Sequence, residues 1–137
     1  MTRSGLSVEV LKDNGDVRGS SFVLPPEALR ALGAVADVHA TTLVPGAVRG
    51  DHFHMTRREL LLVMHCEAWS LHWDDGEGTA VRRRRFEGTG AVLVTVPQLS
   101  SHAVVNEGAA QLRIIGMTDG PYDPAAPDVF PRPVSRA

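Results

Sequence analysis

The sequence predicts an all-β domain, folded as a small sandwich, barrel or jelly roll, with at most one short helix near the N-terminus. Short apolar runs recur along the chain, and segments rich in Gly, Asp or Asn separate them. Helix signals are almost absent. With 137 residues, 43% of them hydrophobic, the chain is long enough to bury a core as one domain, residues 1–137.

Each element follows from a local pattern. The helix is expected at Pro25–Gly33, where Pro begins the segment, good helix formers fill it and Gly follows. The predicted core covers about residues 35–117, and the Pro-rich tail, residues 118–137, is expected to run extended over the barrel surface. The expected strands are, in chain order, Leu6–Lys12, Ser20–Leu24, Val35–Leu43, Glu59–Cys66, Ala68–Trp73, Ala80–Glu87, Ala91–Val96, His102–Asn106 and Gln111–Met117.

Charge and composition exclude several classes of function. A net charge of −2 lacks the basic excess typical of nucleic-acid binding. No apolar run is long enough to span a membrane, no signal peptide is recognisable, and Cys66 has no second cysteine to pair with. We therefore expect a cytoplasmic protein whose partner is a small molecule.

The stretch "RGDHFHMTRREL", residues 49–60, carries the main chemical signal. In a strand, His52 and His54 point to the same side. The four residues before Glu59 allow a tight turn that returns its carboxylate to the same interior, and His102 opens a later strand. Three imidazoles and one carboxylate suit a divalent metal, with zinc as the first choice and iron, manganese, nickel or cobalt as alternatives.

The spacing of these residues resembles the two motifs of the cupin superfamily. Gly46, His52-x-His54 and Glu59 match the first motif; Pro97, His102 and Asn106 match the second. The resemblance covers nearly the whole chain and implies a double-stranded β-helix, or jelly-roll barrel, with those four residues as metal ligands. Two glycines of the motifs are replaced, by Cys66 and Leu99. Neither position is a ligand, so the replacements bear on local turns rather than on the metal.

Flanking residues narrow the resemblance. "RGDHFH" (Arg49–His54) and the tail "YDPAAPDVF" (Tyr122–Phe130) are similar to the C-terminal zinc-binding cupin domain of capsular-polysaccharide sugar-nucleotide reductase/epimerases. This resemblance implies epimerisation at C3 of a 4-keto nucleotide sugar. The Gly-x-Gly-x-x-Gly motif of their reductase domain is missing here. A weaker similarity is to dTDP-4-dehydrorhamnose 3,5-epimerase, which uses no metal and has glutamine where this chain has His54.

Removing a proton next to a ketone requires a base and a group that stabilises the developing enolate. A metal can polarise the carbonyl, and alternation along the strand places His65 on the same face as Glu59, which makes His65 a candidate base. Packing near the barrel end is an equally good interpretation of His65. Arg49 is the candidate for binding a diphosphate. The run Arg82–Arg85 is better explained as a solvated face or a contact with a partner subunit.

The sequence gives fewer indications of a chemical role for the remaining histidines, the tyrosine and the tryptophans. His39 is expected to be structural, His72 to lie on the surface, and Tyr122 is a weak candidate for returning a proton. Dimers are common among cupins, and the tryptophans fit a core or a homodimer interface.

Two other functions stay open. One is a different metal-dependent cupin enzyme, such as a non-haem iron oxygenase, or a lyase or rearrangement catalyst acting on an amino-acid-derived substrate. The other is a non-catalytic module that binds a sugar or small acid, which a pocket filled by apolar side chains would support. Oxygen uptake and the identity of the metal distinguish the oxygenase from the isomerase.

Overall fold

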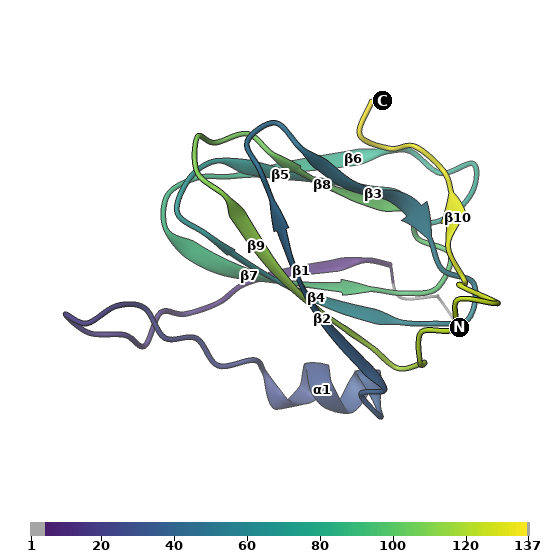
Figure 1. Ribbon diagram of the computed structural model, residues 1–137, viewed down its shortest axis with the longest axis horizontal. Helices are drawn as coiled ribbons and strands as arrows, with labels where there is room; N and C mark the ends of the chain where they lie inside the picture. Colours follow the sequence, from purple (N-terminus) through teal and green to yellow (C-terminus); the bar gives the residue numbers. More distant parts are fainter. Residues whose placement is uncertain (1–4, 137) are drawn as a thin grey trace.

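The computed structural model describes residues 5–136 and consists mainly of two antiparallel five-stranded sheets that face each other (Figure 1). The first sheet has the order β1 (Ser7–Val10), β7 (Gly90–Val96), β4 (Glu59–His65), β9 (Leu112–Thr118) and β2 (Asp37–Leu43). The second has the order β10 (Phe130–Pro131), β3 (Val48–Phe53), β8 (His102–Asn106), β5 (Trp69–Trp73) and β6 (Arg82–Phe86). The predicted all-β architecture is confirmed.

The space between the sheets holds the main core, because alternate side chains on each strand face inward. On β5, Trp69, Leu71 and Trp73 lie in this core. His72 therefore faces outward, where it is hydrogen-bonded to Ser70 (Nε2 to Oγ, 2.9 Å) and largely covered rather than freely exposed.

Helix α1 (Pro26–Leu32) packs on the outer face of the first sheet (Figure 1). Its Leu32 joins a second apolar cluster that includes Leu60 and Leu62 of β4. The predicted helix is thus confirmed. It is seven residues long, and no helix within residues 5–136 is long and apolar enough to cross a bilayer.

Two segments differ from the sequence-based expectation. Ser20–Leu24 forms no strand, since Phe22 and Leu24 pack against the outer cluster instead of pairing with a sheet edge. Conversely, β3 forms a strand from "VRGDHF" although this stretch lacks an apolar run, because β8 and β10 pair with it on either side. Pairing supplied by neighbouring strands has outweighed local composition there.

Candidate metal centre

Three histidines and one glutamate from both sheets meet at one end of the barrel. His52 lies on β3, His54 directly follows that strand, and His102 begins β8. Each imidazole offers one nitrogen, and these nitrogens lie within 4.8 Å of one another. Glu59, the first residue of β4 in the opposite sheet, places Oε1 3.4 Å from His102 Nε2 and 3.7 Å from His54 Nε2.

Local backbone geometry brings the two histidine-bearing strands together. His52 is opposite His102 in the β3–β8 pairing, just after an irregularity between Gly50 and His52. Asp51, at that irregularity, has a φ of 58°, so its side chain turns away from the barrel while His52 turns inward. Gly50 has a φ of 112° and lies so close to β8 that an added Cβ would be 2.9 Å from the Ala103 Cα.

The donor set fits a divalent cation. Ligand atoms about 2.1 Å from a tetrahedral ion lie about 3.4 Å apart, close to the separations between Glu59 Oε1 and the two Nε2 atoms. His54 Nδ1 lies 2.7 Å from the Asp128 carbonyl oxygen and is therefore assigned as the donor, which leaves Nε2 as the lone-pair nitrogen. That Nε2 is buried and makes no hydrogen bond within the described chain. The cluster can therefore hold a metal ion.

The electrostatics of these groups agree with cation binding. Burial and the neighbouring His102 and His54 rings lower the pKa of His52 to about 4, so its ring is neutral near pH 7. Burial opposes ionisation of Glu59, but the imidazoles of His102 and His54 outweigh it and hold the pKa of the carboxyl well below its usual value. Burial opposes protonation of His54, but the Glu59 carboxylate outweighs it and raises the pKa of this ring. A bound cation would displace that proton, because a metal binds the neutral imidazole and the ionised carboxylate.

Two cavities open beside the cluster. One of about 460 Å³ is bounded by polar residues and by the apolar side chains of Leu61, Val104 and Ile114; the other, of about 380 Å³, is lined by Arg57 and Tyr122 among others. Both cavities include His39, His52 and Glu59 in their walls. Their volumes lie in the range of small-molecule sites.

Arg49 lines the larger cavity, as its proposed role in substrate binding requires. Its Nε donates to the Thr42 carbonyl oxygen at 3.3 Å, and within residues 5–136 its guanidinium has no ion-pair partner. The guanidinium can therefore accept an anion.

The structure does not bring His65 to this group. His65 is six positions beyond Glu59 on β4, about 20 Å along an extended strand. Its ring lies near Trp69 and Phe86, and Nδ1 is 2.7 Å from the Gly88 carbonyl oxygen. Alternation did predict the correct face of β4, but Leu61 and Val63 fill the core between the two ends of that face.

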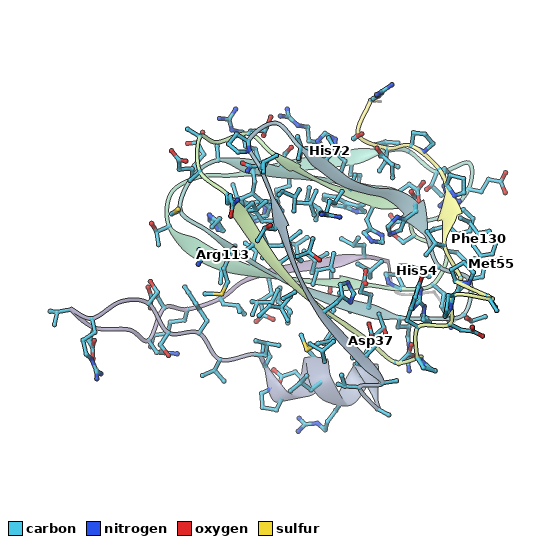
Figure 2. The ribbon with its side chains drawn as sticks, viewed as in Figure 1. Asp37, His54, Met55, His72, Arg113 and Phe130 are labelled. Carbon is cyan, nitrogen blue, oxygen red and sulfur yellow. The ribbon has the colours of Figure 1, made fainter. Side chains whose placement is uncertain are left out.

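His39 is the site residue that sequence reasoning missed. It lies on β2, with Nδ1 3.1 Å from Asp37 Oδ2 and Nε2 4.0 Å from Glu59 Oε2. Figure 2 labels Asp37, at the start of this strand, and His54 at the end of the barrel that holds the cluster. "DVH" at residues 37–39 places an acid and a histidine on the same face of a strand, and this was the available signal.

The arginine run does not reach the centre. All of Arg82–Arg85 are exposed on β6, the edge strand of the second sheet. Three of them form ion pairs, which are Arg82 with Asp75, Arg83 with Glu107 and Arg85 with Glu87. The fourth, Arg84, lies over the Phe86 ring.

A jelly-roll barrel with histidines and a glutamate gathered at one open end defines a cupin. The sequence matches the family described as "Polysaccharide biosynthesis C-terminal domain" over residues 14–130, and the chain belongs to that family. No curated protein matches the sequence significantly.

Solved structures share this fold. The capsular polysaccharide assembling protein CapF from Staphylococcus aureus is 24% identical (TM-score 0.66); the match covers 90% of this chain but only 33% of CapF. NovW, a 4-keto-6-deoxy sugar epimerase from Streptomyces spheroides, is 19% identical (TM-score 0.69), with coverage of 88% and 66%. ChmJ, a 3'-monoepimerase from Streptomyces bikiniensis solved with dTDP, is 15% identical (TM-score 0.75), with coverage of 96% and 70%.

Proposed function

We propose that this protein is a metal-dependent cupin enzyme that epimerises or isomerises a 4-keto nucleotide sugar by removing a proton next to the ketone. The convergence of His52, His54, His102 and Glu59 beside a cavity of about 460 Å³ carries the proposal. Family membership and the sugar epimerases of the same fold support it. An open cavity of this size suits an enzyme and a module that only binds, and measured turnover distinguishes the two.

The three histidines and Glu59 would hold the metal, with zinc as the first choice from the resemblance to the capsular enzymes. A divalent ion bound there supplies a Lewis acid for a carbonyl oxygen. Leu61, Val104 and Ile114 line the same cavity, so they limit water around a bound sugar.

His39 is the residue that we propose for proton transfer. Both cavities include it, and the Asp37 carboxylate accepts a hydrogen bond from Nδ1, which leaves Nε2 facing the cluster. Arg49, which also lines the larger cavity, would bind the diphosphate of the nucleotide, because a guanidinium pairs well with phosphate oxygens.

The direct test combines metal analysis of the purified protein with incorporation of deuterium from D₂O into 4-keto-6-deoxy nucleotide sugars, followed by NMR. We expect one divalent ion per chain and exchange at a carbon next to the ketone. A fully metallated protein that exchanges no proton in any such sugar would refute the proposed reaction. Ferrous iron with oxygen uptake would favour the oxygenase instead.

Paired variants assign the base. His39→Gln should abolish exchange while the metal content stays unchanged, because His39 is placed beside the ligands rather than among them. Loss of exchange in His65→Gln, with His39→Gln active, would instead favour His65. His52→Ala should remove the metal, and a variant that keeps its full metal content would contradict the ligand assignment.

A further inference from the structure

The C-terminal tail returns to the metal centre, where hydrogen bonds hold it through β10 and through the residues that follow β10. β10 pairs with β3 through Phe130 opposite Phe53 and Pro131 opposite His52. Figure 2 shows Phe130 near Met55 and His54 at this end of the barrel. Beyond β10, Asp51 accepts hydrogen bonds from the main-chain nitrogens of Val134 and Ser135.

Arg132 forms a second fastening for the tail. Its guanidinium forms two hydrogen bonds with the Asp74 carboxylate, both 2.8 Å, and lies 4.3 Å above the Phe53 ring. Planar paired contacts of this kind hold both partners in one orientation. The tail segment that precedes Arg132 is therefore held in a defined position.

Asp128 is the tail residue that contacts a candidate ligand. Its carbonyl oxygen accepts the hydrogen bond from His54 Nδ1 at 2.7 Å. Its carboxylate accepts from the main-chain nitrogens of the three residues after His54, at 2.8, 3.1 and 3.0 Å, and from the Thr56 hydroxyl at 2.8 Å. One residue thus binds both the ring of His54 and the loop that follows it.

The backbone of Asp128 adopts the left-handed conformation, with a φ of 50°. Few residues other than Gly adopt it without cost, although Asp tolerates it better than most. In this conformation the carbonyl and the carboxylate of Asp128 both contact the segment that begins at His54.

We propose that Asp128 is a positioning residue of the metal centre, which fixes the tautomer and ring orientation of His54 so that Nε2 faces the other ligands. Neutral imidazole carries a proton on only one nitrogen, so an acceptor at Nδ1 makes Nε2 the free donor to a cation. Groups that hydrogen-bond a metal ligand in this way raise the affinity for the metal, and their removal typically weakens metal binding by about 10- to 100-fold. The proposal rests on the metal-binding part of the proposed function and not on the reaction.

Zinc affinity, measured by competition with a chromophoric chelator, tests the proposal. Asp128→Gly keeps the carbonyl but removes the carboxylate that fastens Asp128 to the main chain after His54, and it does so without straining the left-handed backbone. The carbonyl is then no longer held against the His54 ring, and we expect zinc to bind at least 10-fold more weakly. Asp123→Gly is the matched control, because within residues 5–136 the Asp123 carboxylate accepts a hydrogen bond only from the main-chain nitrogen of Ala125 in the same tail. Its affinity should stay within twofold of the wild type.

Each outcome separates the two proposals. Wild-type affinity in folded Asp128→Gly would overturn the positioning role while leaving the metal site intact. Absence of zinc binding by the wild type would overturn both. Equal losses in both variants would also overturn the role of Asp128, since any change in the tail would then have the same effect.

A second measurement needs no variant and applies even if Asp128→Gly fails to fold. In nitrogen-detected NMR spectra of the zinc-loaded wild type, His54 should carry its proton on Nδ1, with a hydrogen bond to a carbonyl, and its Nε2 should show the shift of a metal-bound nitrogen. A proton on Nε2 with a metal-bound Nδ1 would overturn the proposal.

Discussion

Replacement of Gly50 by alanine is the sharpest test of how the fold builds the candidate metal centre. An added Cβ would lie 2.9 Å from the Ala103 Cα and closer still to the His102 carbonyl oxygen, whereas ordinary contact begins at 3.4 Å. Both neighbours are backbone atoms, so β3 and β8 must separate by at least about half an ångström. The left-handed backbone costs about 1–2 kcal/mol and the overpacking about 1–3 kcal/mol, which together give about 2–5 kcal/mol.

Gly46→Ala separates the two costs. Gly46 has a φ of 81°, but an added Cβ there meets nothing within 4 Å, so this variant should lose only about 1–2 kcal/mol. Urea unfolding of metal-free protein gives both free energies, and chelator competition gives the zinc affinities. We expect weaker zinc binding only in Gly50→Ala, because His52 and His102 move apart. Equal unfolding free energies and equal zinc affinities would refute the close-approach argument.

Three further results are expected. In metal-free protein the pKa of His52 is lowered from 6.5 to about 4 in the folded state, so between these pH values the unfolded chain binds one more proton than the folded chain. The free energy of unfolding should therefore fall by up to about 3 kcal/mol as the pH decreases from 6.5 to 4. The free energy of unfolding of His52→Gln should fall less steeply with pH, and an unchanged slope would contradict the pKa shift. Asn106→Asp should lower the free energy of unfolding in urea by about 2–4 kcal/mol, because the Asn106 amide donates hydrogen bonds to the carbonyl oxygens of Leu43 and Ala110 and a carboxylate cannot donate. A loss below about 1 kcal/mol would show that these carbonyl oxygens find other donors. Glu59→Gln removes the negative charge from the ligand set, so zinc should bind at least about 10-fold more weakly in the chelator assay, and wild-type affinity would exclude Glu59 as a ligand.

The sequence was sufficient for the parts of the site that depend on spacing and alternation. His52 and His54 share a face because they are two positions apart, and the spacing of the motifs predicted that Glu59 and His102 would lie beside them. Leu99 shows why a replaced motif glycine did not matter. It adopts a φ of 72°, the left-handed conformation that Gly favours, and its main-chain nitrogen still donates to the His54 carbonyl oxygen at 2.7 Å.

What could not be predicted depends on positions between distant segments. Alternation identifies a face but not a distance along it, so His65 looked equivalent to residues near the opposite end of β4. His39 looked structural because nothing local indicates that β2 lies beside the cluster. That placement follows from the pairing of β2 with β9, in which His39 lies opposite Gly116, far along the chain. The contact of Asp128 with His54 spans 74 residues.

The three non-glycine residues with left-handed backbones in residues 5–136 are Asp51, Leu99 and Asp128. Each lies next to His52 in the chain or bonds directly to His54. Conformational cost is therefore concentrated where the cation would bind, and a bound ion would offset it by mass action. The melting temperature of this protein should then rise with the concentration of free metal. The heat tolerance of the protein in the cell would therefore depend on how much free metal the cell contains.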